Sequence, residues 1–154
     1  MRILVLHGPN LNLLGVREPE VYGTVTLEAL DRALVARGEA LGVAVDTFQS
    51  NHEGALVDRL QEALGTHRGV LLNPGGLTHT SVVLRDAVSA VALPTVEVHL
   101  THIDAREPFR RVSRVAPVCV ARVAGFGAHG YLLALEGLVA RLRAAPFPPA
   151  GTIG

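Results

Sequence analysis

The chain has 154 residues, the length of one domain that buries roughly 70% of the surface its unfolded form exposes. Its formal charge is zero, with 14 basic and 14 acidic side chains, and aromatic residues make up 4% without tryptophan. This composition excludes nucleic-acid binding by bulk charge and disfavours stacking of bases. Because every basic residue is arginine, the composition also excludes Schiff-base, pyridoxal phosphate and P-loop chemistry, each of which needs lysine.

Short aliphatic runs alternate with longer segments of helical period, which is typical of a parallel sheet with crossover helices. The predicted strands are residues 3–6, 44–49, 69–73, 95–99 and 117–124. The predicted helices are residues 27–41, 53–64, 80–91 and 131–143. Most strands are apolar throughout, as strands covered on both faces should be. The pattern predicts an α/β fold: a flavodoxin-like, doubly wound, five-stranded parallel sheet with strand order 2-1-3-4-5 and helices on both faces.

Turn and cap residues support these boundaries. Gly42 and Gly65 follow the first two helices as stop signals, and Ser50 and Glu53 have the spacing of a capping box at the start of the second helix. We expect a single α/β domain at residues 1–145, followed by a Pro/Gly-rich and poorly ordered tail at residues 146–154.

Cysteine usage and the first residues bear on the cellular compartment. Cys119 is the single cysteine, so the chain cannot close an internal disulfide, and its apolar neighbours predict a buried, inert thiol. The apolar stretch at residues 3–6 is too short for the hydrophobic region of a signal peptide or for a membrane span. We therefore expect a cytoplasmic protein.

Polar residues gather where the predicted strands end. In an open α/β sheet, ligands bind beyond the carboxyl ends of the strands, and amides, imidazoles and hydroxyls follow four of these ends. The segments concerned are residues 7–23, 49–54, 73–81 and 97–102. They suit a small ligand rich in hydroxyl groups. A dinucleotide is not expected, because the loop at residues 8–10 lacks a G-x-G-x-x-G pattern, and no G-x-S-x-G motif suggests a serine hydrolase.

Histidines are the candidate metal ligands. His99 and His102, which are separated by two residues, and His79 are the ones that could be proposed as zinc ligands. No cysteine or carboxylate completes a recognisable ligand spacing with them, so we expect no metal site. His7 is expected to be a hydrogen-bonded structural residue, His52 to hold the second loop, and His67 and His129 to lie at the surface or in loops.

Several uncommon strings occur in a fixed order. They are G-P-N-L-N-L-L-G-x-R-E-P-x-x-Y-G at 8–23, F-Q-S-N-H-E-G at 48–54, N-P-G-x-x-T-H-T-S at 73–81, E-V-H-L at 97–100, A-R-E-P-F-R at 105–110 and G-F-G-x-x-G-Y at 125–131. Over nearly its whole length the chain resembles the type II 3-dehydroquinate dehydratases. The resemblance implies a lyase that converts 3-dehydroquinate to 3-dehydroshikimate by anti elimination through an enolate, in the shikimate pathway of aromatic amino-acid biosynthesis. It further implies no cofactor and no metal, no nucleic-acid or membrane partner, and a homo-oligomer, a dodecamer built as a tetramer of trimers.

The same resemblance suggests catalytic roles for five residues. Tyr22 would be the base and His99 the general acid, with Glu97 orienting the imidazole and Asn10 stabilising the enolate. A phenol has a reference pKa of about 10, so its ionisation near neutrality requires roughly 4 kcal/mol. One arginine about 4 Å from the phenolate supplies on the order of 4 kcal/mol at an effective dielectric constant near 20. The arginine expected in this role is Arg17, five residues before Tyr22 in the same string.

Substrate-binding residues also follow from the resemblance. They are Asn73, His79, Asp86, Leu100, Thr101, Arg106 and Arg110. Asp86 would reach the site of a neighbouring subunit, Arg106 would close over the site with its loop or form a surface salt bridge, and Arg110 would bind the carboxylate as a fork.

Two short segments depart from the family pattern. Thr101-His102 replaces the usual Ser-Asn, and Gly76-Leu77 replaces the usual Ala-Tyr, so contacts beside the substrate are expected to differ. Two alternatives stay open: a non-catalytic flavodoxin-like module that binds a polyhydroxylated carboxylic acid, and a purely structural oligomer.

Overall fold

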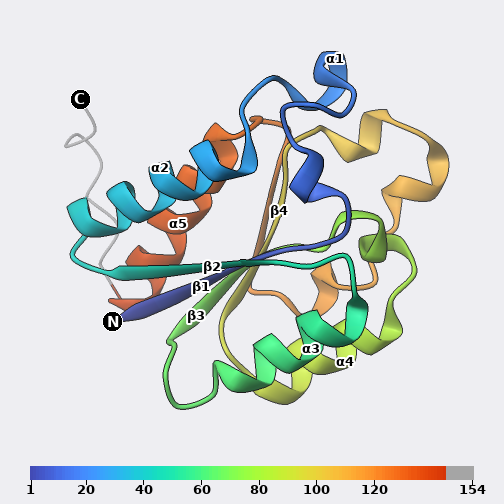
Figure 1. The fold of residues 1–154 in the computed structure, drawn as a ribbon. Coiled ribbons are helices and arrows are strands. Elements are labelled where there is room, and N and C mark those ends of the chain that lie inside the picture. Colours follow the sequence, from blue (N-terminus) through green and yellow to red (C-terminus); the bar gives the residue numbers. More distant parts are fainter. Residues whose placement is uncertain (145–154) are drawn as a thin grey trace, which may run out of the picture.

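Five parallel strands form one sheet in the order β2-β1-β3-β4-β5 in the computed structural model, which describes residues 1–144. The strands are β1 (Arg2–His7), β2 (Ala44–Gln49), β3 (Gly69–Asn73), β4 (Thr95–His99) and β5 (Ala121–Ala124) (Figure 1). The expected α/β flavodoxin-like architecture and its strand order are confirmed. The expected tail at 146–154 and the last residue of the expected domain lie outside the described residues.

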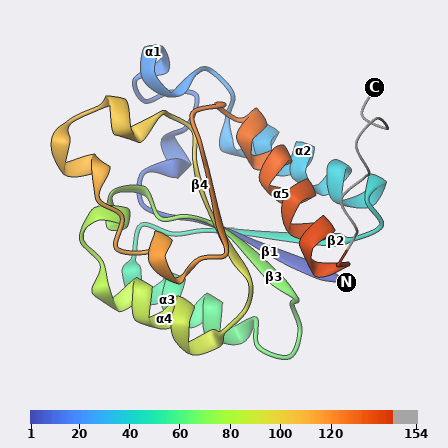
Figure 2. The ribbon, with the colours of Figure 1, turned by 180° about the vertical axis from the view of Figure 1, so that it is seen from behind.

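Helices cover both faces of the sheet. The helices α2 (Leu27–Ala40) and α5 (His129–Leu142) pack on one face, and α3 (Glu53–Glu62) and α4 (Val82–Val91) on the other (Figures 1 and 2). A four-residue helix, α1 (Pro19–Tyr22), lies beyond the end of the sheet. The 3₁₀ turns are η1 (Leu11–Leu13), η2 (Gly75–His79), η3 (Ile103–Ala105), η4 (Pro108–Arg111) and η5 (Ala116–Val118). No helix within residues 1–144 has the length and apolarity needed to cross a membrane.

The strand predictions hold except at the fifth strand. The predicted bounds of β2, β3 and β4 match the structure, and β1 extends one residue further at each end. The prediction for 117–124 is wrong in its first half, where the chain forms η5 instead. Pro117 explains this, because proline cannot donate a hydrogen bond to a ladder and favours the first turn of a helix.

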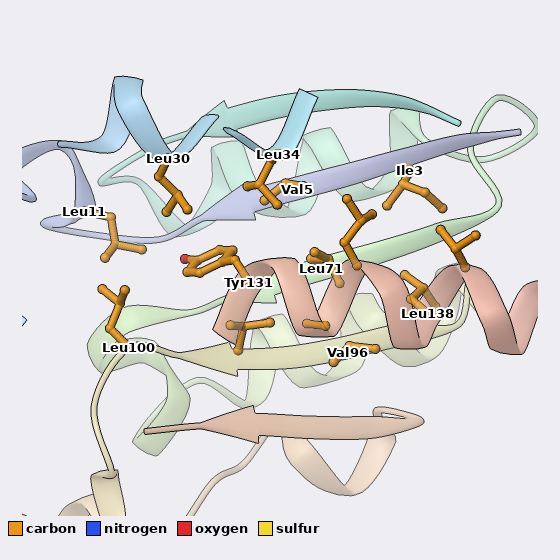
Figure 3. Close-up of a cluster of buried hydrophobic side chains, with 14 of the residues drawn as sticks. Ile3, Val5, Leu11, Leu30, Leu34, Leu71, Val96, Leu100, Tyr131 and Leu138 are labelled. Atoms are coloured by element: carbon orange, nitrogen blue, oxygen red, sulfur yellow. The ribbon is translucent and has the colours of Figure 1, made fainter. Parts of the chain in front are cut away.

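Two hydrophobic clusters hold the layers together. One lies between the sheet and α2 and α5, and the other between the sheet and α3 and α4. Figure 3 shows the first cluster, with Leu30 and Leu34 of α2 and Leu138 of α5 facing the strands. Full burial of one leucine side chain stabilises the folded state by about 1.5–3 kcal/mol. Packing of the apolar strand residues against the helices therefore stabilises the sheet from which the loops of the cavity extend.

The ends of the helices follow the sequence in part. Gly42 and Gly65 have positive φ angles of 71° and 76°, so both stop signals are confirmed. The capping box is wrong: Ser50 Oγ accepts from the backbone N–H of His52, and Glu53 instead accepts from Ser81 Oγ at 2.6 Å. Ser81 also caps α4, so the carboxylate of Glu53 joins α3 to the start of α4.

The histidine and cysteine expectations have mixed outcomes. His7 is fully buried with hydrogen bonds at both ring nitrogens, and His129 is exposed, as expected. His67 lies in the loop between α3 and β3, as expected, but it is buried there, with Nε2 2.9 Å from the Asp46 carboxylate. Cys119 is half-buried, so the expected full burial is wrong. Burial is the main cause that raises the pKa of its thiol to about 12, which agrees with the expected inertness.

Candidate active site

A cavity of about 230 Å³ opens at the carboxyl ends of β1, β3 and β4. Ten of the twelve predicted site residues line it: Asn10, Arg17, Tyr22, Asn73, His79, His99, Leu100, Thr101, Arg106 and Arg110. Glu97 is buried directly behind His99, and Asp86 lies exposed on α4, outside the lining. Sequence reasoning therefore located this cavity at the expected end of the sheet.

Two glycines bring the loops after β1 and β3 into contact. Gly8 donates its backbone N–H to the Asn73 carbonyl at 2.8 Å, and a Cβ at Gly8 would lie 2.6 Å from the carbonyl carbon of Pro74. Gly75 has a φ of +58°, and a Cβ there would lie 2.9 Å from the Pro9 oxygen. Only glycine permits this close approach at both positions, so the two loops form one fixed wall of the cavity.

Asn73 is held by a chain of buried hydrogen bonds. Its side chain donates Nδ2–H to Tyr131 Oη at 2.9 Å and accepts from the backbone N–H of Gly75 at 3.1 Å. Since Tyr131 accepts from Asn73, its own proton points to His7 Nδ1, 3.2 Å away, and His7 Nε2–H donates to Asp31 at 2.8 Å. Burial raises the pKa of Tyr131, so the phenol stays protonated. The amide of Asn73 therefore has one fixed orientation.

Tyr131→Phe is expected to lower the free energy of unfolding by about 1–3 kcal/mol, because two buried polar groups, on Asn73 and His7, lose their partner. Urea unfolding followed by circular dichroism measures the change. Tyr22→Phe is the matched control, since its hydroxyl lies in the partly exposed cavity wall, and it should unfold near the wild-type midpoint. Equal stability of Tyr131→Phe and wild type would contradict the hydrogen-bond chain.

Two guanidinium groups lie close to the phenol of Tyr22. Arg106 donates Nη2–H to Tyr22 Oη at 3.1 Å, and its Cζ is 5.3 Å from the ring centroid. Arg17 lies over the ring with its Cζ 5.0 Å from the centroid and pairs with Glu18 at 3.5 Å. The expected contact between arginine and phenol is present, but the hydrogen bond to the oxygen comes from Arg106 and not from Arg17.

The short helix α1 places Tyr22 at the mouth of the cavity. Pro19 starts the helix, and Gly23, with a φ of +83°, ends it directly after Tyr22. Glu18 adopts a φ of +42°, which is unfavourable for a residue with a side chain. Figures 1 and 2 both show α1 at the same end of the molecule as the segment that follows β4. This proximity is what lets Arg106 reach Tyr22.

His99 and Glu97 form a buried pair on β4. They are two residues apart and so share one face of the strand; Glu97 is fully buried and His99 is 6% exposed. Burial alone would raise the pKa of Glu97, but hydrogen bonds from His99 and Ser113 and the charges of His99 and Arg122 together lower it below its usual value. The ionised carboxylate accepts Nε2–H of His99 at 2.6 Å, which leaves Nδ1 for a ligand.

The remaining lining residues supply polar groups around this pair. His79 Nδ1–H donates to the Val112 carbonyl at 2.8 Å, which frees Nε2. Thr101 Oγ1 accepts from Arg106 at 3.3 Å, while Arg110 is paired with Glu107.

Asn10 occupies the left-handed region at a φ of 71°, a conformation that asparagine tolerates. Its backbone N–H donates to Asn51 Oδ1 at 2.9 Å, which fixes the loop.

The departures from the family strings fall at different places. Thr101 and Gly76 line the cavity, whereas Leu77 packs against the core next to α3 and α4. His102 is exposed and lies beside Gly125, outside this cavity. Within residues 1–144, no three His, Cys, Asp or Glu side chains are grouped as a metal site would require.

Sequence reasoning missed the residues behind the cavity wall. Ser113 and Arg122 contact Glu97. Tyr131 accepts directly from Asn73, and Asp31 supports Tyr131 through His7. Arg122 could have been noticed in the sequence, because a charged residue within an apolar strand requires a partner of opposite charge. The others carried no local signal, since their partners are distant in the sequence.

Comparisons with known proteins agree with this geometry. The family model "Dehydroquinase class II" matches residues 1–139. A 3-dehydroquinate dehydratase of Ruegeria pomeroyi is 62% identical over 140 residues, covering 91% of this chain and 94% of the relative, and one of Nostoc sp. is 57% identical over 143 residues, covering 93% and 97%. The crystal structure of a type II dehydroquinase from Butyrivibrio crossotus has a TM-score of 0.88 at 41% identity and covers 90% of this chain and 97% of that one. The chain belongs to the class II dehydroquinase family.

Proposed function

We propose that this chain is a 3-dehydroquinate dehydratase, a hydro-lyase that forms 3-dehydroshikimate and water. Its family and the names of its relatives support this activity. The observation that carries the mechanism is the phenol of Tyr22, hydrogen-bonded by Arg106, in the same cavity as the pair of His99 and Glu97. The cavity thus holds both a base and an acid, as an elimination of water requires.

The first step removes a proton next to the ketone. Ionised Tyr22 takes the proton from carbon, and the C–H electron pair moves to the ketone to form an enolate. Ionisation of a phenol near neutrality requires about 4 kcal/mol, and a guanidinium at hydrogen-bond distance supplies on the order of that energy. Arg106 and Arg17 are the groups proposed to stabilise the phenolate, and Asn10 the group that stabilises the enolate oxygen.

The second step expels the hydroxyl. The enolate electrons re-form the ketone and a carbon–carbon double bond, and the C–O bond breaks while protonated His99 gives its Nδ1 proton to the departing oxygen. Glu97 accepts Nε2–H throughout and orients the ring. The products are the conjugated enone and one water molecule, and the proton held by Tyr22 replaces the one lost by His99 through solvent.

The other lining residues are proposed to hold the substrate. Asn73, His79 and Thr101 present amide, imidazole and hydroxyl groups suited to the hydroxyls of the substrate, and the backbone at Leu100 adds a further contact. Arg110 is suited to its carboxylate, because a guanidinium binds a carboxylate through two parallel hydrogen bonds. No cofactor takes part in these steps.

We further propose that the chain assembles with copies of itself, as a dodecamer built from trimers. Exposed apolar side chains support self-association: Val82 and Val83 start α4, and Phe109 and Val112 lie near the cavity, each more than half exposed. Asp86 shares α4 with the two valines and would approach the site of a neighbouring copy. Sedimentation equilibrium tests this mass, and a cytoplasmic location is a separate proposal that cell fractionation tests.

The activity is tested by adding 3-dehydroquinate to the purified chain and recording ultraviolet absorbance. The conjugated enone should appear at a rate proportional to the enzyme concentration, and a chelator should not change that rate. Binding of 3-dehydroquinate without turnover would instead show a non-catalytic binding module, and absence of both binding and turnover would show a structural role.

A further inference from the structure

Arg122 lies behind the pair of His99 and Glu97, on the side away from the cavity. It stands on β5 in register with Glu97 on β4, and its side chain is 28% exposed. Its Nε lies 3.2 Å from Glu97 Oε1. Among the described residues neither its Nε nor its Nη2, both buried, has a hydrogen-bond partner. Arg122 therefore acts on Glu97 through its charge and not through an aligned hydrogen bond.

Arg122 and His99 approach the same carboxylate oxygen. Glu97 Oε1 accepts Nε2–H of His99 at 2.6 Å and has Arg122 Nε at 3.2 Å, while Oε2 accepts from Ser113 Oγ at 2.7 Å. When His99 is protonated, two cations share one buried anion. When His99 is neutral, the charges of Arg122 and Glu97 balance. Because an unbalanced charge is costly in a buried site, Arg122 favours release of the proton from His99.

We propose that Arg122 is a positioning residue that sets the acid strength of His99 through Glu97, so that the imidazolium gives up its proton readily to the departing hydroxyl. The inference rests on the proposed function, in which His99 is the general acid. Without Arg122, the attraction of Glu97 for the imidazolium would be unopposed, and His99 would be a weaker acid.

Other charged and titratable groups face this pair. The Cys119 thiol lies near Glu97, but its pKa of about 12, raised chiefly by burial, keeps it neutral. On the cavity side the groups are Arg17, Tyr22, His79, Arg106 and Arg110. None of these cavity groups contacts Arg122. Their electrostatic effects on His99 are therefore the same in the wild type and in the variants at position 122, and they cancel in the comparison.

The test is the pH dependence of kcat/KM for 3-dehydroquinate in the full chain. In Arg122→Leu, the alkaline limb of the profile is expected to move up by about one pH unit, since one nearby positive charge is lost. Arg122→Gln, a second neutral variant, should show the same displacement, and Arg122→Lys, which keeps the charge, should leave the limb near its wild-type position. Arg32→Leu on α2 removes an equal charge far from Glu97 and should not move the limb.

Titration of His99 by nuclear magnetic resonance tests the effect of Arg122 on His99 without requiring turnover. Among the seven histidines, its ring signal is assigned by its loss in His99→Gln, and its midpoint should rise in the two neutral variants. An unmoved limb and an unmoved midpoint in either folded neutral variant would overturn the role of Arg122, as would a displaced limb in Arg122→Lys. A wild-type chain without turnover would overturn the proposed function instead, and the resonance titration would still decide the inference.

Discussion

Tyr22→Phe is expected to lower kcat by about 10²–10⁴-fold, the range that a positioned base contributes. The ring, its packing and the guanidinium groups of Arg17 and Arg106 beside it stay in place, whereas the oxygen proposed to take the proton is lost together with its hydrogen bond from Arg106. Steady-state kinetics measures kcat, and isothermal titration calorimetry measures binding of 3-dehydroquinate, which should be largely retained.

Val21→Ala is the matched control for Tyr22→Phe. It changes the neighbouring exposed side chain on α1 without touching the phenol, so its kcat should stay near that of the wild type. Near-normal turnover in Tyr22→Phe would remove Tyr22 from the role of base. A large loss of kcat in Val21→Ala would show that α1 tolerates no substitution. The loss in Tyr22→Phe would then be explained by a displaced α1 and not by the missing hydroxyl.

His99→Gln should also reduce kcat by about 10²–10⁴-fold, because an amide cannot deliver a proton to the departing hydroxyl. Glutamine retains an amide N–H that can still hydrogen-bond to Glu97, so the buried carboxylate keeps a donor. The pH profile adds a second readout, since the alkaline limb that reports His99 should disappear. His129→Gln, which alters an exposed histidine on α5, should leave both kcat and the profile unchanged.

A substrate with a better leaving group than hydroxyl separates acid catalysis from a structural effect. Such a substrate needs no protonation of the leaving group, so His99→Gln should recover most of its rate with it, whereas Tyr22→Phe should not. Equal losses with both substrates would contradict the assignment of His99 as the acid.

The sheet was predictable because most of its strands are short, mainly apolar runs between segments of helical period. Residues 69–73 and 95–99 are buried on both faces, and their bounds match the prediction. The error at Pro117 arose because an apolar run does not distinguish a strand from a short turn, and only the missing N–H of proline decides between them. The false capping box arose because Glu53 finds a tertiary partner in Ser81, which no local spacing reveals.

The candidate site was predictable where its residues follow strand ends or belong to local strings. Contacts between residues that are far apart in the sequence could not be predicted. Arg106 meets Tyr22 across 84 residues, and this contact depends on how the loop after β4 folds towards α1. The pairing of Glu97 with Arg122 depends on the register of β4 with β5. Such contacts are set by the packing of the whole domain and not by spacing along the sequence.

Ultraviolet titration tests the proposal that guanidinium groups hold the phenol of Tyr22 ionised. The chain has two tyrosines and no tryptophan, and burial raises the pKa of Tyr131, so phenolate absorbance at moderate pH reports Tyr22 alone. At the same moderately alkaline pH we expect less phenolate absorbance in Arg106→Met than in the wild type, because the variant lacks the guanidinium group that hydrogen-bonds to Tyr22 Oη. Equal phenolate absorbance in the two folded proteins would contradict the proposed stabilisation of the phenolate by Arg106.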